Sequence, residues 1–115
     1  TMNNVIATAT DGSNDNFGVL NVSSSPTMNN VTATATGGTN NNYGVSNEVS
    51  SSTIRNSSIT GDTNSIVNDV DSNAKVADTM LDGPVTAGAG LACVGAYADF
   101  VALDENCAAV PVPTP

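Results

Sequence analysis

The chain has 115 residues, two basic and eleven acidic side chains, a formal net charge of −9 and only 3% aromatic residues. This acidity argues against binding of nucleic acids or anionic membranes, because both need a basic surface, and no apolar run is long enough for a transmembrane helix. Charged residues make up 11% of the chain, whereas disordered chains usually carry more charge and fewer β-branched residues. The composition therefore favours a single repetitive domain built from small aliphatic residues.

Residues 1–26 and 27–52 are two copies of one repeat, which align without a gap and agree at 17 of 26 positions. Residues 53–72 form a third copy with a shorter turn region. Within each copy, apolar and polar residues alternate in short pieces separated by Asn, Gly and Ser, a pattern that predicts strands. The density of Asn, Gly, Ser and Thr disfavours helix throughout the first 73 residues.

A repeat of this length with several short strands is typical of a β-solenoid, in which coils stack about 4.8 Å apart. We therefore predict an all-β fold, a parallel β-helix of about three coils. Equivalent residues should lie above one another. The expected interior columns are Met2–Met28–Ile54 and Val19–Val45–Ile66, and the expected files of stacked asparagines are Asn4–Asn30–Asn56 and Asn21–Asn47–Asn68.

The pattern T-[MI]-x-N-x-x-[AI]-T, followed by GV-x-N and, in the first copy, SSSP, resembles the right-handed parallel β-helix repeats of bacterial secreted and surface proteins. The resemblance covers residues 1–72 and implies an extracellular, bacterial setting. It implies no single function, since the fold carries lyases, tailspikes, adhesins and inert spacers. The sugar-cleaving members depend on clustered Asp, Arg or Lys on one strand face. We expect the strand segments of the first two copies to be uncharged, so we expect no enzyme activity and no cofactor.

From residue 73 the composition changes. We predict a C-terminal cap module over 73–107, with a strand pair at 74–82, turns at 83–84 and 87–90, and a further strand at 91–97. Bulky residues that the repeats lack are supplied by Phe100, Val101 and Leu103. The segment resembles the end module behind such repeats in bacterial extracellular and tail-fibre-like proteins. Residues 108–115 are expected to form an extended, proline-rich tail.

Cys93 and Cys107 are the two cysteines of the chain. A disulfide between them would close a loop of about 15 residues, contribute about 3 kcal/mol, and lock the cap. It would also indicate an oxidising compartment. A metal site would want more ligands and the chain has no His; that site and a pair of buried free thiols are the alternatives to the disulfide.

Other polar groups have weaker interpretations. Residues 11–16 faintly resemble a calcium loop, and Asp69 and Asp71, with Asp62 nearby, could bind calcium or act as paired carboxylates. Neither set has a fixed ligand spacing, so we expect solvated turns. Asn21, Asn30 and Asn56 match glycosylation sequons, but we expect them mainly as ladder residues. Thr-x-Thr rungs suited to ice binding are too few; they comprise Thr8 with Thr10 and Thr34 with Thr36, followed by Thr60 alone.

The chain begins flush with a full repeat and without Met, which suggests a processed product or a fragment of a longer protein. A first coil at that position would expose an open row of backbone N–H and C=O groups, an edge suited to assembly. We expect a structural extracellular subunit that assembles with itself, head to tail, into a surface filament or fibre. The alternative is a glycan- or receptor-binding module of an adhesin or tail-fibre-like protein, as a monomer or a trimer, with surface glycans as its partner.

Overall fold

The computed structural model describes residues 1–85, 90–98 and 101–110. Every regular element in these residues is a β-strand. The strands are β1 (Met2–Asn3), β2 (Ile6–Thr10), β3 (Asn16–Val22), β4 (Thr27–Asn29), β5 (Thr32–Thr36), β6 (Asn42–Glu48), β7 (Ser51–Arg55), β8 (Ser58–Gly61), β9 (Asn64–Asn68), β10 (Asn73–Ala77), β11 (Met80–Asp82), β12 (Leu91–Val94), β13 (Tyr97–Ala98) and β14 (Val101–Ala102).

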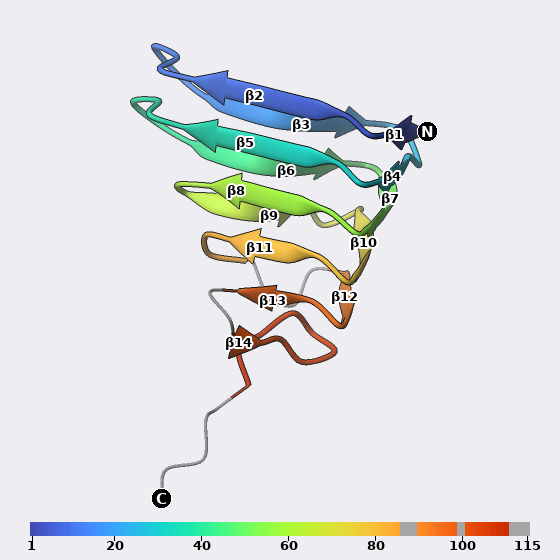
Figure 1. The fold of residues 1–115 in the computed structure, drawn as a ribbon. Helices are drawn as coiled ribbons and strands as arrows, with labels where there is room; N and C mark the ends of the chain where they lie inside the picture. Colours follow the sequence, from blue (N-terminus) through green and yellow to red (C-terminus); the bar gives the residue numbers. More distant parts are fainter. Residues whose placement is uncertain (86–89, 99–100, 111–115) are drawn as a thin grey trace, which may run out of the picture.

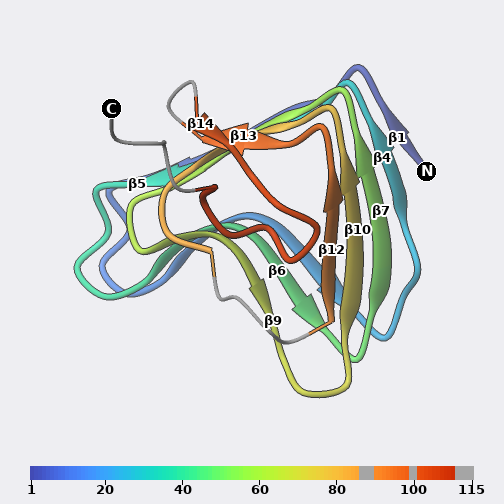
Figure 2. The same ribbon diagram turned by 90° about the horizontal axis from the view of Figure 1, so that it is seen from below.

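The strands wind into stacked coils that share three sheets, as Figures 1 and 2 show. Sheet A has the order β1-β4-β7-β10-β12, sheet B the order β14-β13-β11-β8-β5-β2, and sheet C the order β3-β6-β9. All pairings are parallel except that of β13 with β14. The predicted all-β parallel solenoid is confirmed, and the three sequence copies form its first three coils.

The repeat sets the register between coils. Met28 lies opposite Met2, Ala33 opposite Ala7 and Val45 opposite Val19, each 26 residues later. In the third coil the offset falls to 21, since Ile66 lies opposite Val45. The shorter turn between β8 and β9 absorbs the difference, so the strands stay in register although the third copy is shorter.

The stack continues beyond residue 72. Strand β10 pairs with β7 and β11 pairs with β8, and Val85 bridges to Ile66, so residues 73–85 form a fourth coil. Strands β12 and β13 add part of a fifth. The change of composition at residue 73 thus falls inside the parallel stack, and the stack ends where β14 turns antiparallel on β13.

Buried aliphatic columns fill the tube. The column of Met2, Met28 and Ile54 continues with Val76 and ends at Cys93. Val19, Val45 and Ile66 form a second column, which Val85 extends. A third contains Ala7, Ala33, Ile59 and Leu81. From the second coil onward the members of these columns are almost fully buried, except the partly buried Val85. Small side chains therefore suffice for the core, because every coil covers the next.

One prediction about the strands is wrong, and three others fall wholly or mostly on residues that the structure does not describe. The strands of the first two copies are not uncharged, because β6 ends at the exposed Glu48; the alternating pattern had placed this residue beyond the strand. Phe100, most of the turn expected at 87–90 and the tail from residue 111 lie outside the described residues.

Candidate interaction surfaces

One asparagine column lies inside the solenoid. The Asn21 amide donates to Oδ1 of Asn47 at 2.8 Å, and the Asn47 amide donates to Oδ1 of Asn68 at 2.8 Å. All three side chains are buried. A side-chain amide has both donors and an acceptor, so stacked asparagines can hydrogen-bond to one another along the axis. The column therefore supplies hydrogen bonds that a buried polar group requires.

The other asparagine column lies at the exposed corner between sheets A and B. Asn4, Asn30 and Asn56 all have left-handed backbones, with φ of 56°, 55° and 49°. Asn30 donates to Oδ1 of Asn4 at 2.6 Å, but Asn56 donates to Oδ1 of Asn29 at 3.1 Å. The side-chain ladder expected for all three therefore stops after the second member.

The corner column continues in the backbone beyond the asparagines. Asp78 follows Asn56 with φ of 46°, and Gly95 follows Asp78 with φ of 64°. The backbone N–H of Asn56 donates to the carbonyl of Ala77, as each corner N–H donates to the coil below. Asn, Asp and Gly are the residues that best tolerate this conformation, so the corner selects for backbone shape.

Sequence reasoning missed three further ladders. Asn16 and Asn42 are buried and joined by a 3.0 Å hydrogen bond; their identity at a spacing of 26 was a usable signal. Ser50 donates to the Asn21 carbonyl and Ser72 to the Asn47 carbonyl, so these two hydroxyls repeat one contact in successive coils. Ser57 and Thr79 each donate to the carbonyl two residues earlier, a third repeated contact with no matching residue in the first two copies.

The C-terminal end of the stack is closed. Cys93 and Cys107 form a disulfide with a Cα–Cα distance of 5.1 Å, and both are buried. The free side of β12 receives Glu105, whose carbonyl accepts from Cys93 N–H at 2.9 Å, and Leu103 N–H donates to the Ala96 carbonyl at 2.9 Å. The disulfide thus fixes a closing segment, residues 101–110, over the last coil. A disulfide is typical of proteins in non-reducing compartments.

The first coil is different, because within the described residues no segment pairs with the outer edges of β1, β2 and β3. Its interior residues Met2, Val5 and Ala7 are only partly buried, whereas their equivalents in the second coil are completely covered. The core is therefore accessible at this end.

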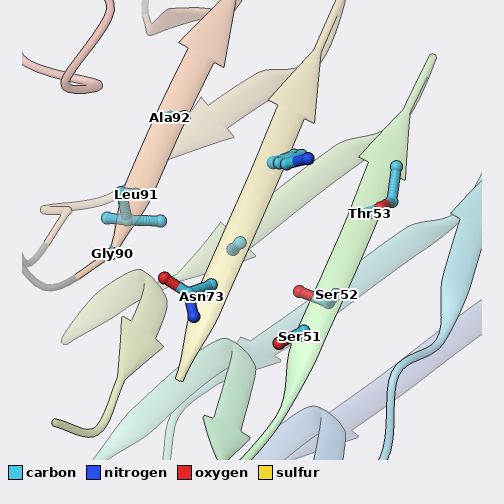
Figure 3. Close-up of a pocket in the computed structure, with 9 residues that line it drawn as sticks. Ser51, Ser52, Thr53, Asn73, Gly90, Leu91 and Ala92 are labelled. Carbon is cyan, nitrogen blue, oxygen red and sulfur yellow. The ribbon is translucent and has the colours of Figure 1, made fainter. Parts of the chain in front are cut away.

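The outward face of sheet A carries both cationic residues of the chain, Arg55 on β7 and Lys75 on β10. The strands of this sheet contain no acidic residue. Figure 3 shows Ser51 and Thr53 on β7, Asn73 on β10 and Ala92 on β12 along this face. Two shallow hollows lie side by side here, of about 500 Å³ and 370 Å³, and Lys75 lines both.

The acidic residues considered for calcium binding lie at three turns: Asp11 and Asp15 between β2 and β3, Asp62 between β8 and β9, and Asp69 and Asp71 between β9 and β10. Asp15 accepts from the Asn41 N–H at 3.2 Å, and Asp62 accepts from the Gly37 N–H at 3.1 Å. Each of these two carboxylates thus accepts a hydrogen bond from the neighbouring coil. No cluster of three or more metal-binding side chains occurs among residues 1–85, 90–98 and 101–110.

The carboxyl group of Asp69 has a pKa below its usual value. The Ser72 hydroxyl donates to it at 2.6 Å and lowers its pKa, and the backbone N–H groups of Val49 and Asp71 act in the same direction. Partial desolvation opposes them. These hydrogen bonds link the residues of the turn and favour the ionised form of the carboxyl group.

The threonines considered for ice binding and the asparagines of the sequons lie on different parts of the solenoid. Thr8, Thr34 and Thr60 lie in one file on sheet B, which Asp82 follows. Of the sequon residues, Asn21 is buried while Asn30 and Asn56 are exposed.

In the described part of the chain, no helix is long and apolar enough to cross a membrane. No family model, curated protein or solved structure matches this chain.

Proposed function

We propose that the chain is a structural β-solenoid subunit that assembles through the edge of its first coil, with a second copy of the chain as its partner. The observation that carries the proposal is the difference between the ends: the last coil is sealed by residues 101–110, and the first has its strand edges unpaired. Strand edges of this kind are templates for pairing with another chain.

The groups available for pairing follow from the hydrogen bonds of the first coil. The Val5 carbonyl accepts from Thr32, and Asp11 N–H donates to the Thr36 carbonyl. Because main-chain groups alternate along a strand, residues 7 and 9 also face the second coil. The N–H and C=O groups of Ile6, Thr8 and Thr10 therefore face away from it and form the unpaired row of β2.

These contacts favour a geometry that joins two first coils. Pairing of a first coil with the other end of a neighbour is disfavoured because β12 and β13 already receive the closing segment. Two copies joined at their first coils would form one longer rod with a disulfide-sealed end at each extremity. The head-to-tail filament expected from the repeats instead requires the outer side of residues 101–110 to accept a first coil.

The setting belongs to the same proposal. The repeats resemble bacterial secreted and surface proteins, and the Cys93–Cys107 disulfide suits an oxidising environment. We therefore propose an extracellular, cell-surface subunit with a structural rather than an enzymatic role.

The test is a proline at Thr8. Proline removes an N–H from the free edge and leaves the bonds to the second coil in place. The wild type should sediment as an elongated end-to-end dimer, and Thr8→Pro should lack that species while keeping the same far-UV circular dichroism spectrum. Thr8→Val keeps the N–H and should still dimerise. A wild type without the elongated end-to-end dimer at any concentration, or a Thr8→Pro that still forms it, would contradict the proposal, and an open series of ever longer species would favour the head-to-tail fibre.

A second candidate function is glycan or receptor binding by an adhesin-like module. It is favoured by one observation: Phe17 and Tyr43, on adjacent coils, form a half-buried aromatic pair with ring centroids 5.8 Å apart. Aromatic rings of this kind provide platforms for sugars. Binding on a glycan array that Tyr43→Ala abolishes, with the fold retained, would support it; an array without signal would argue against it.

A further inference from the structure

The charges of the molecule are segregated. Both cations lie on the outer face of sheet A, whose strands carry no acidic residue, while the acidic residues of the described chain lie at turns, at the ends of β6 and β11 and in the closing segment. Arg55 lies opposite Ala77, and Lys75 lies two residues before Ala77 on the same strand. The two cations are therefore diagonal neighbours on adjacent strands. On a chain with a net charge of −9, this is the one sheet face where a negatively charged partner meets local attraction.

The face is also hollowed between these side chains. The 370 Å³ hollow is lined by Arg55, Lys75, Ala77, Ala92 and Val94 among others. Its floor is low because two of the residues are alanines, and Val94 at its side is 74% exposed. The hollow thus combines an apolar floor with a positive rim, and it would accept a small apolar side chain flanked by carboxylates.

The chain itself carries a segment of that composition. The turn between β9 and β10 reads Asp69-Val70-Asp71, and Val70 is 93% exposed, the highest value among the exposed large apolar residues. Figure 2 shows this turn as the lowest point of the molecule in that view, at the corner of sheets C and A. The bonds of Asp69 to Ser72 and to the Asp71 N–H hold the turn in shape. A turn that is ordered in advance loses little entropy on docking.

We propose that the solenoid associates side by side, with the Asp69–Asp71 turn of one copy seated in the Arg55–Lys75 hollow of a second copy. Val70 fills the apolar floor, and the carboxylates of the turn, with the exposed Glu48 beside them, face the two cations. The two surfaces differ, so the contact is heterologous: it closes into a ring, such as a trimer, or continues as a row. This contact uses neither the first coil nor the closing segment, and it does not depend on the end-to-end pairing proposed above.

Salt dependence alone would not test the contact. Screening weakens the local attraction between the turn and the hollow, but it also weakens the overall repulsion between two chains of charge −9. Reversing the charges on one surface at a time separates these effects.

The experiment uses two variants in the Thr8→Pro background, which removes end-to-end pairing. Arg55→Glu with Lys75→Glu reverses the hollow, and Glu48→Lys with Asp71→Lys reverses the turn without touching the structural Asp69. Each variant alone should associate at least about tenfold more weakly than its parent in sedimentation velocity, because like charges then meet. An equal mixture should regain association, because opposite charges face each other again in both possible contacts.

The mixture also controls for net charge. The reversals move the net charge from −9 to −13 and to −5, so long-range repulsion in the mixture stays close to that of the parent. Thr8→Pro that remains monomeric at every concentration, or a mixture no better associated than the separate variants, would overturn the proposal. Loss of dimers in Thr8→Pro with side-by-side species retained would support both contacts; side-by-side species in a wild type without end-to-end pairs would support this one alone.

Discussion

The two asparagine columns have the same residue at the same spacing in the first two coils but differ in what the fold requires of them. In the inner column, Asn21, Asn47 and Asn68 are buried and each amide bonds to the next. In the corner column, Asn30 is exposed and the positions below it are Asn56, Asp78 and finally Gly95. The inner column retains the side chain, whereas the corner retains the left-handed backbone.

The difference teaches how to interpret an asparagine repeat. A buried amide that lost its neighbour would leave polar groups unsatisfied, at a cost of about 1–3 kcal/mol each. A corner asparagine contributes mainly through its tolerance of positive φ, for which Gly and Asp are adequate substitutes. Substitutions that remove the amide, with and without straining the left-handed backbone, test this distinction.

The largest effect is expected for Asn47→Leu. The substitution removes the acceptor of the Asn21 amide and the donor to Asn68, and both partners stay buried. We expect the free energy of unfolding to fall by about 2–4 kcal/mol, measured by urea denaturation followed by circular dichroism. A loss below about 0.5 kcal/mol would mean that the inner column is not a structural ladder.

Asn30→Val should come second. The corner backbone has φ of 55°, which a β-branched residue adopts with strain of about 1–2 kcal/mol. The exposed Asn30 to Asn4 bond contributes little, so strain should dominate the loss of stability. Thermal unfolding of the variant measures it. Equal stability of Asn30→Val and wild type would contradict a backbone role for the corner.

Asn30→Gly is the matched control for that substitution. Glycine removes the amide as valine does but accepts the left-handed backbone, so we expect a change of only a few tenths of a kcal/mol. The outcome to watch is the order of the three variants: if Asn30→Gly is as damaging as Asn47→Leu, the two columns have the same role and the comparison fails.

The smallest effect is expected in the pH dependence of stability, to which the asparagine side chains do not contribute directly because they do not titrate. Hydrogen bonds, first that from Ser72, lower the folded-state pKa of Asp69. A lowered pKa contributes stability that is present above the unfolded value of about 3.9 and is lost as the pH falls through the folded value. Wild type should therefore lose slightly more stability on acidification than Asp69→Asn. Parallel unfolding curves for the two proteins in acid would exclude this contribution.

Much of the fold could be predicted because the repeat is nearly exact. A spacing of 26 residues places Met2 with Met28 and Val19 with Val45 in one step. The same argument applied to Asn16 and Asn42 would have found the second buried amide pair. Conserved spacing is a strong signal because each coil must offer its groups to the next at the same position.

The rest could not be read from spacing because the later coils keep the geometry with different residues. Val76 and Cys93 extend the methionine column, and Asp78 and Gly95 extend the corner, but none repeats the earlier sequence. Arg55 and Lys75 are one coil apart and lie on one face only through the register of β7 with β10. The hollows on sheet A depend on which residues become neighbours across the strands, so they could not be predicted from the sequence.

The sealed last coil and the bare first coil also imply a gradient in amide hydrogen exchange along the axis. In a stack where each layer is held by its neighbours, local opening starts at the layer that has one neighbour only. In the Thr8→Pro variant, whose first coil stays unpaired, backbone amides of β2 should thus exchange fastest, and those of β8, with β5 on one side and β11 on the other, should be the slowest to do so.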